Sequence, residues 1–300
     1  MTKQSACLIF NPVAGQGNAE AELQRIRQLL DPDLALTVQQ TAKGMNPTLL
    51  AEAAIREGAT LLIASGGDGT LSDVAEAVVN TNIPLGIIPR GTANSFARSL
   101  GIPQDIEAAC QTIVQGHTRT VDAALCNGKL MLLLTGIGLQ AEMVAKADRK
   151  TKDRLGVIAY VIAGVQQLMQ LPRFQAQIKT DTEQFICETV AITIANAAPA
   201  TSVLAQGAPQ VIVDDGLLDI TLVSPRSKWE ALAAGLQLLT YALRQTARHG
   251  RKVDYRRARS IQILADPPQK VAIDGDVIGF TPAEIKCLPQ SLTVLVPGSL

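Results

Sequence analysis

The stretch LLIASGGDGT, residues 61–70, decides the fold of this chain. Its first half, Leu61–Ser65, contains no charged residue and predicts a strand that is buried on both faces. Three glycines in the next four positions let the backbone turn sharply and approach a ligand without interference from a Cβ atom. A helix over Leu71–Val79 follows, so the free N–H groups of its first turn point into this loop. The stretch therefore predicts a strand–loop–helix unit that binds a phosphate group.

Strands and helices alternate on both sides of this unit. The apolar periodicity predicts strands at Ala6–Phe10, Leu34–Gln39 and Leu85–Pro89, and helices at Asn18–Leu30, Thr48–Glu57 and Ala93–Leu100. Such alternation with short links predicts a three-layer α/β domain, in which helices cover both faces of a mostly parallel sheet. Ligands of these sheets bind at the carboxyl ends of the strands.

The pattern changes after residue 120, where short alternating runs predict the strands of an antiparallel β-sandwich. These strands are expected at Val121–Cys126, Leu130–Thr135, Phe174–Thr180, Glu188–Ala195, Leu218–Val223, Ser260–Ala265, Val271–Asp274 and Thr293–Val296. Helices are expected at Gly156–Met169 and Lys228–Leu243. The apolar stripe of the second helix is more typical of core packing than of a membrane-inserting face.

Length and composition support two globular domains. The chain has 300 residues, of which 47% are hydrophobic and 18% charged, which excludes a disordered protein. Lys plus Arg and Asp plus Glu both number 27, so no global positive charge exists to hold nucleic acid. Aromatic residues make up only 3% of the chain, which also disfavours base-stacking surfaces.

The five cysteines are widely spaced and contain no CxxC pair, which disfavours both a zinc site and a secreted disulfide framework. The N-terminal apolar run is too short for a signal peptide. The apolar stretch near 155–165 falls short of the roughly 18–20 residues that span a bilayer. We therefore expect a soluble, cytoplasmic protein whose membrane contact, if any, is peripheral.

Two further loops follow predicted strands. The first, NPVAG (11–15), lacks the third glycine of a dinucleotide fingerprint, and the chain has no GK[ST] sequence, so neither a Rossmann NAD site nor a P-loop is expected. The second, PRGTANSFA (89–97), offers Thr92 and Asn94 as side-chain donors. Its Arg90 is interpreted either as a phosphate ligand or as an ordinary exposed arginine. Three such loops at one sheet edge predict a nucleotide phosphate site.

Asp68 is unusual in a phosphate loop because a carboxylate repels anions. Its presence is explained if a Mg²⁺ ion or a hydroxyl group mediates the contact. The alternative is a plain turn in which Asp68 or Thr70 caps the following helix.

NPVAG, GGDGT (66–70) and PRGTANSFA closely resemble the signature blocks of the diacylglycerol kinase catalytic domain, a family that includes sphingosine and ceramide kinases and soluble bacterial lipid kinases. LGVIAY (155–160), IAN (194–196), DDGLLD (214–219) and IDGD (273–276) continue the resemblance over the whole chain. It implies transfer of the γ-phosphoryl group of ATP to a lipid hydroxyl. It also implies an α/β nucleotide-binding domain over 1–124 and 288–300, to which Leu292–Val296 return, and a β-sandwich lipid-acceptor domain over 125–287.

The resemblance also implies site residues. It places Asp68 at the phosphates through Mg²⁺ or water. It places a second Mg²⁺ on the Asp215 side chain and the carbonyls of Ile212 and Leu217, where a plain hairpin turn is an equal alternative. The ATP site would be lined by Asn11, Pro12, Val13, Ala14, Gly15, Thr41, Gly66, Gly67, Asp68, Gly69, Thr70, Leu71, Ser72, Thr92 and Asn94.

The implied general base closes the IDGD motif. It is usually Glu in this family, but here it is Asp276, one methylene shorter. Asp274, expected two residues earlier on the same strand face, is the alternative or a partner in the same role. A polar hairpin without catalytic function is the third interpretation. Ser95 and Asp73 also depart from the commoner Asp and Glu of the family.

Seven basic residues cluster between positions 244 and 259, with Asp254 as the one opposing charge. They predict either contact with an anionic membrane surface or a solvated strand and loop. The alternatives to a lipid kinase are an NAD kinase-like enzyme and a nucleotide- or lipid-binding regulator with impaired catalysis. A homodimer is left open. The basic residues are Arg244, Arg248, Arg251, Lys252, Arg256, Arg257 and Arg259.

Overall fold

The computed structural model describes residues 3–15, 17–138, 141–142, 173–199, 211–224, 230 and 253–298. The chain divides into two compact units. Unit 1 comprises Met1–Ala123 and Pro289–Leu300, and unit 2 comprises Ala124–Leu288. The predicted helix Gly156–Met169 lies outside the described residues, as does the predicted helix Lys228–Leu243 apart from residue 230. Among the residues that are described, no helix is long and apolar enough to cross a membrane.

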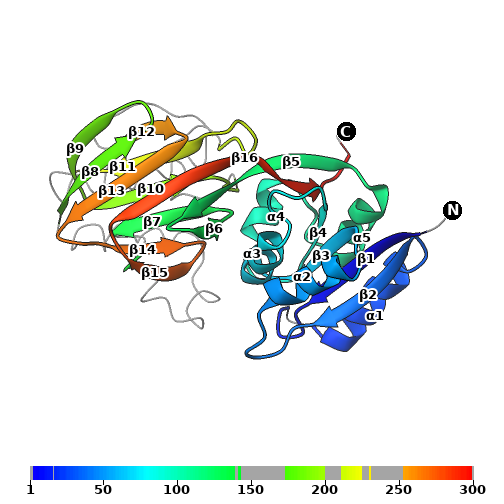
Figure 1. The fold of residues 1–300 in the computed structure, drawn as a ribbon. Helices are drawn as coiled ribbons and strands as arrows, with labels where there is room; N and C mark the ends of the chain where they lie inside the picture. Colours follow the sequence, from blue (N-terminus) through cyan, green and yellow to red (C-terminus); the bar gives the residue numbers. More distant parts are fainter. Residues whose placement is uncertain are drawn as a thin grey trace. The chain divides into compact units, whose positions relative to one another are not determined.

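Unit 1 is an α/β domain built on a parallel sheet (Figure 1). Its strands follow the order β2 (Leu34–Gln40), β1 (Gln4–Phe10), β3 (Leu61–Gly66), β4 (Leu85–Pro89), after which the end of β16 (Ala283–Leu295) pairs in parallel with β4. The buried strands β3 and β4 are uncharged, as the sequence predicts. The return of Leu292–Val296 to this sheet agrees with the expectation.

Helices lie on both faces of this sheet. On one face, α1 (Ala19–Leu30) packs beside α5 (Ile106–Gln115), and Ile26 and Leu30 join a core with Leu8 and Phe10. The helices α2 (Pro47–Arg56) and α3 (Asp68–Glu76) pack beside each other, and α4 (Ser95–Ser99) follows β4. This confirms the predicted layered α/β architecture.

Two details of unit 1 differ from the prediction. The helix α3 begins at Asp68 rather than at Leu71, because the extended backbone of Gly67 already serves as its N-cap. Asp68, Gly69 and Thr70 therefore belong to the first helical turn and not to a loop. The helix α5 was not predicted from the sequence, although Asp105 caps it by accepting a hydrogen bond from the Ala108 N–H group at 3.0 Å.

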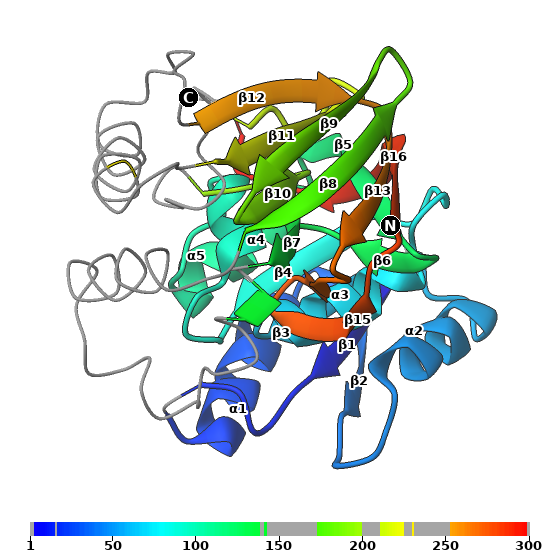
Figure 2. The same cartoon turned by 90° about the vertical axis from the view of Figure 1, so that its left-hand side faces the viewer.

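Unit 2 is an antiparallel sandwich of two sheets, as predicted. One sheet has the order β12 (Val253–Ala258), β11 (Leu218–Val223), β10 (Ala191–Ala195), β7 (Leu134–Gly138), β14 (Lys270–Ile273), β15 (Asp276–Phe280). The other contains the start of β16, β13 (Ser260–Asp266) and the hairpin of β8 (Phe174–Thr180) and β9 (Gln184–Thr189), which is plain in Figure 2. Their apolar faces share one core.

Two predicted strands of unit 2 prove to be two strands each. The run Glu188–Ala195 changes sheets at Val190, because β9 pairs with β8 whereas β10 pairs with β7 and β11. The run Leu130–Thr135 is divided between β6 (Lys129–Met131) and β7. The strand predicted at Val121–Cys126 as the first of the sandwich begins earlier than expected, as β5 (Thr118–Cys126), and pairs with both β6 and β16.

Candidate active site

The carboxyl ends of the four parallel strands of unit 1 are tied to one another by backbone hydrogen bonds. The Thr41 N–H group donates to the Phe10 carbonyl at 2.9 Å, and the Asn11 N–H group donates to the Ser65 carbonyl at 2.9 Å. The Arg90 N–H group donates to the Gly66 carbonyl at 2.8 Å. The three predicted loops and Thr41 therefore lie at one edge of the sheet, where ligands of such sheets bind.

Two of the loops touch through glycines. A Cβ atom on Gly91 would lie 2.5 Å from the Cα atom of Gly67, closer than any side chain allows. A Cβ atom on Gly66 would lie 2.6 Å from the Thr70 hydroxyl oxygen. Glycine at these positions is therefore required by the close approach of the two backbones and of the first turn of α3.

The N-terminus of α3 faces this edge without a side-chain cap, because its N-cap residue is Gly67. The first N–H groups of a helix have no partner within the helix, and together with the helix dipole they favour an anion. Phosphate is the anion that such glycine-rich strand–helix turns bind in other proteins. The geometry of this turn thus suits the predicted phosphate contact of Gly66–Ser72.

Asp68 does not cap α3, so the capping interpretation is wrong for this residue. Its carboxylate accepts a hydrogen bond from the Phe96 N–H group at 3.2 Å and thereby links α3 to the start of α4. The carboxylate is only partly buried. This carboxylate of the GGDGT turn could hold a divalent cation together with phosphate oxygens. Mg²⁺ is a hard cation and favours such oxygen ligands.

Asn11 and Asn94 shape the loops with their side chains. The Asn11 amide donates to the Thr70 hydroxyl at 2.8 Å, and its oxygen accepts from the Val13 N–H group at 3.1 Å. Asn94 is buried with φ 48°, and its amide exchanges two hydrogen bonds of 2.8 Å with the Gly91 backbone. Its side-chain donors are therefore already used, which corrects the expectation that they face a ligand. Thr92, by contrast, is exposed.

Both interpretations of Arg90 from the sequence, a phosphate ligand and an ordinary exposed arginine, are wrong. Its side chain is 2% exposed, and it forms an ion pair with Glu22 of α1. A buried arginine in an ion pair is not an ordinary surface residue, and its charge is not available to a phosphate. Glu22 carries no sequence signal that would single it out among the acidic residues of a helical first turn.

The IDGD motif of unit 2 is a two-residue hairpin turn between β14 and β15. Asp274 and Gly275 both have positive φ, 49° and 101°, as the Asp-Gly pair of a tight hairpin requires. Asp276 pairs with Ile273 as the first residue of β15. The prediction that Asp274 and Asp276 share a strand face is therefore wrong, because the turn separates them.

The two carboxylates of this hairpin have different surroundings. The Asp274 carboxylate accepts three backbone hydrogen bonds, from Leu132 at 2.8 Å, Leu133 at 3.0 Å and Leu134 at 2.8 Å. This arrangement fastens the hairpin to the start of β7. Asp276 is exposed to solvent. The Asp276 carboxylate is thus open to a substrate, whereas the Asp274 carboxylate is occupied by three backbone N–H donors.

In the predicted metal-binding loop, Asp215 pairs with the side chain of Arg257. One oxygen of Asp215 accepts from the Leu217 N–H group at 3.1 Å, and the other pairs with the Arg257 guanidinium. Ile212 is exposed. The Asp215 carboxylate, which the resemblance assigns to Mg²⁺, is therefore already paired with Arg257. Within the described part of the chain, no three His, Cys, Asp or Glu side chains are grouped to hold a metal.

A buried acidic group lies beside this loop. Asp219 is 1% exposed and accepts a hydrogen bond from the Tyr255 hydroxyl, while the Arg257 Nε atom lies 3.2 Å from its Oδ1 atom. Burial raises the pKa of Asp219 to about 6, although both neighbours favour its charged form. Burial and the Asp219 carboxylate also raise the pKa of Tyr255.

Two of the described residues of the basic segment, Arg256 and Arg257, are engaged in internal contacts, whereas Arg259 is exposed. Arg256 pairs with Glu183 and, at 3.0 Å, with Asp254, and its guanidinium lies 4.1 Å from the centroid of the Phe185 ring. Arg257 is paired as described above. The two residues therefore offer little free charge to a membrane. Arg244, Arg248, Arg251 and Lys252 lie outside the described residues.

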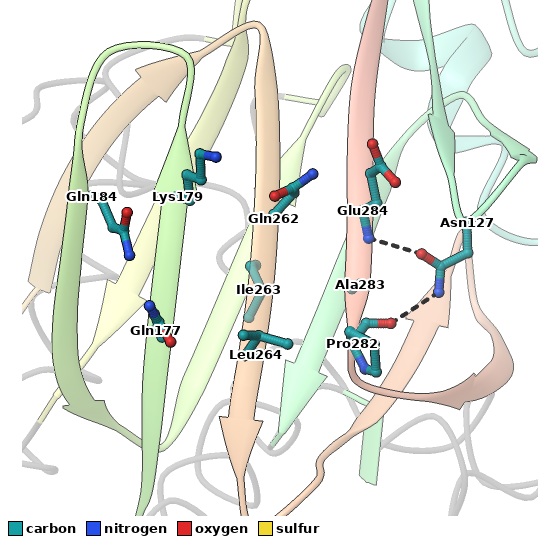
Figure 3. Close-up of a pocket in the computed structure, with 10 residues that line it drawn as sticks. All are labelled: Asn127, Gln177, Lys179, Gln184, Gln262, Ile263, Leu264, Pro282, Ala283 and Glu284. Atoms are coloured by element: carbon teal, nitrogen blue, oxygen red, sulfur yellow. Dashed lines mark hydrogen bonds between the residues drawn. The ribbon is translucent and has the colours of Figure 1, made fainter.

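A groove of about 330 Å³ lies on the outer face of the β16–β13–β8–β9 sheet (Figure 3). Asn127 borders it and bridges its backbone by accepting from the Glu284 N–H group at 2.8 Å and donating to the Pro282 carbonyl at 3.2 Å. None of the predicted site residues lines this groove. Its polar walls come mainly from Gln177, Lys179, Gln184, Gln262 and Glu284.

Asp122 is a buried residue that sequence analysis did not single out. It is 1% exposed, and its carboxylate accepts from the Gln290 N–H group at 2.7 Å. The sequence signal was available, because an acidic residue within the apolar run Val121–Cys126 has to find a partner when the strand is buried.

Comparison with known proteins identifies the relatives of this chain. The model of the diacylglycerol kinase catalytic domain matches residues 5–126, and that of the YegS C-terminal NAD kinase beta sandwich-like domain matches residues 134–296. A diacylglycerol kinase from Staphylococcus aureus is 30% identical over 99% of this chain and 94% of its own length. The diacylglycerol kinase of Bacillus subtilis is 29% identical over 97% of this chain and 96% of its own.

Two further matches extend the comparison. A Synechocystis protein described only as uncharacterized is 50% identical over 97% of this chain and 70% of its own length. The crystal structure of a proposed diacylglycerol kinase from Bacillus anthracis superposes with a TM-score of 0.81 at 28% identity, covering 99% of this chain and 98% of that one. The chain thus belongs to the diacylglycerol kinase family and is a lipid kinase.

Proposed function

We propose that the enzyme transfers the γ-phosphoryl group of ATP to the hydroxyl group of a membrane lipid, with diacylglycerol as the first acceptor to test. The observation that carries this proposal is the uncapped N-terminus of α3, at a sheet edge where three glycine-containing loops meet. The relatives from Bacillus subtilis and Staphylococcus aureus are called diacylglycerol kinases, which supports this choice of acceptor.

Residues of unit 1 bind the nucleotide in this proposal. The backbone N–H groups at the start of α3 receive the phosphates, and the glycines keep the approach open. Asp68 would hold a Mg²⁺ ion, whose positive charge would neutralise the phosphates. The nucleotide-binding part comprises residues 1–124 and 288–300, and the ligand-facing set is Asn11, Pro12, Val13, Ala14, Gly15, Thr41, Gly66–Ser72 and Thr92.

Asp276 of unit 2 is the proposed general base, and Asp274 is not. A base must reach the acceptor hydroxyl and accept its proton, and the exposed carboxylate of Asp276 can do so. The carboxylate of Asp274 instead holds three backbone N–H groups. The acceptor lipid is reached by peripheral contact with a membrane, and part 125–287 of the chain is its binding domain.

An acceptor panel tests the proposal. Purified enzyme with Mg²⁺ and radiolabelled ATP is offered diacylglycerol, phosphatidylglycerol or sphingosine in mixed micelles, or NAD in solution. We expect label in a lipid product, and we expect Asp276→Asn to remove it without weakening ATP binding. Label in NADP would replace the proposal by an NAD kinase. ATP binding without any labelled product would indicate a regulator with impaired catalysis.

A further inference from the structure

The guanidinium group of Arg90 makes several hydrogen bonds at the sheet edge of unit 1. It projects from the residue directly after β4. Its Nε atom donates to the Glu22 carboxylate at 2.8 Å, its Nη1 atom donates to the Asn11 carbonyl at 2.8 Å, and its Nη2 atom donates to the Ala14 carbonyl at 2.8 Å and also pairs with Glu22. These contacts occupy all three nitrogens of the group.

The plane and the charge of this guanidinium are both fixed. Its carbon lies 4.2 Å from the centroid of the Phe10 ring, which holds one face of the plane. Glu22 neutralises it, and Glu22 is itself anchored in the first turn of α1 with a side chain that is 24% exposed. Arginine suits this place because its planar fork donates in several fixed directions, which the single ammonium group of lysine does not.

The two carbonyls that Arg90 holds belong to the NPVAG loop. The same loop reaches the GGDGT turn, because the side chain of Asn11 donates to the Thr70 hydroxyl at 2.8 Å. The backbone of Arg90 in turn donates to the Gly66 carbonyl at 2.8 Å. Gly15 closes the loop with φ 92°, and a Cβ atom there would lie 3.4 Å from the Arg90 Nη2 atom. One buried cation therefore connects all three loops.

We propose that Arg90 and Glu22 form a positioning pair that fixes the shape of the NPVAG loop for the nucleotide. Neither residue touches the nucleotide; the pair acts through the Asn11 and Ala14 carbonyls. This inference rests on the proposed use of ATP. Its consequence is that a change in the pair weakens ATP binding, while the site of the lipid acceptor in unit 2 keeps its affinity.

The test compares Arg90→Lys and Glu22→Gln with a matched control, Arg25→Gln. Arg25 lies on the same helix α1 and pairs with Glu107 at 2.8 Å. Unlike the buried Arg90, the side chains of Arg25 and Glu107 are both half exposed. Binding of ATP with Mg²⁺ is measured by calorimetry, and the Michaelis constants for ATP and diacylglycerol are measured separately. Glu22→Gln keeps the size of the side chain. This variant therefore still tests the pair if Arg90→Lys does not fold.

We expect Arg90→Lys and Glu22→Gln to raise the dissociation constant for ATP roughly 10- to 100-fold, because small displacements of positioning groups have effects of this order. The Michaelis constant for diacylglycerol should stay within about twofold, as should all constants of Arg25→Gln. A folded Glu22→Gln protein with the ATP affinity of the wild type would overturn the inference. Failure of the wild type to bind ATP would instead overturn the proposed function.

Discussion

The exchange of Asp274 for Asn distinguishes the carboxylate that holds the β14–β15 hairpin from Asp276, the proposed general base. Asn tolerates the positive φ of 49°, so the turn itself can form. The change replaces one carboxylate oxygen by an NH₂ group that faces the Leu132 N–H donor, and it removes the negative charge from the bonds to Leu133 and Leu134. Hydrogen bonds to charged groups contribute about 1.5–3 kcal/mol each, so we expect a loss of roughly 2–4 kcal/mol in the free energy of unfolding.

Urea denaturation followed by circular dichroism measures this loss, and turnover of diacylglycerol is measured at a temperature where the variant is still folded. We expect the turnover of Asp274→Asn to remain within about threefold of the wild type, since a general base that was lost would lower the rate by about 10²–10⁴. Asp274→Asn with unchanged stability and strongly reduced turnover would refute this reasoning and make Asp274 the base.

Three other predictions concern separate parts of the molecule. Asp276→Asn should lower turnover about 10²–10⁴-fold with unchanged urea stability, because its side chain is exposed, whereas Asp276→Glu should retain activity; steady-state kinetics checks both. Gly91→Ala should destabilise unit 1 by about 1–3 kcal/mol or more in thermal denaturation, since the added Cβ atom would meet the Gly67 backbone at 2.5 Å. Burial raises the pKa of Asp219 to about 6, so this residue takes up a proton on folding between about pH 4 and 6. Its contribution to the free energy of unfolding should therefore fall as the pH rises through this range and stay level above it. Asp219→Asn should flatten that part of the curve of stability against pH, and a wild-type curve that is already flat there would contradict the assignment.

Much of the α/β unit could be predicted from the sequence because its signals are local. The strands Leu61–Gly66 and Leu85–Pro89 are uninterrupted apolar runs, and glycines mark the turns that follow them. The position of the three glycine-containing loops at one sheet edge follows from the parallel topology alone. The start of α3 was misplaced by one turn, because Asp-Gly-Thr has a weak helix propensity that the N-cap position of Gly67 overrides.

The side-chain partners could not be predicted, because they depend on contacts distant in the sequence. Arg90 meets Glu22, Asp274 meets the backbone at Leu132–Leu134, and Asp215 meets Arg257. In each pair the sequence identifies a charged residue in a motif but not the group that compensates its charge. This explains why the sequence leaves a binding role open for both Arg90 and Arg257 beside an ordinary exposed position, although both are paired within the protein.

The late position of β16 in the chain affects when the sheet of unit 1 can be completed during synthesis. Its end forms the neighbour of β4 in unit 1, and the Gln290 N–H group there completes the bonding of Asp122, 168 residues earlier. A ribosome therefore produces all of unit 2 before it releases the strand that unit 1 still needs. Until then β4 presents an unpaired edge, which is the kind of surface that recruits chaperones or aggregates. A fragment ending at residue 124 would keep that edge open permanently.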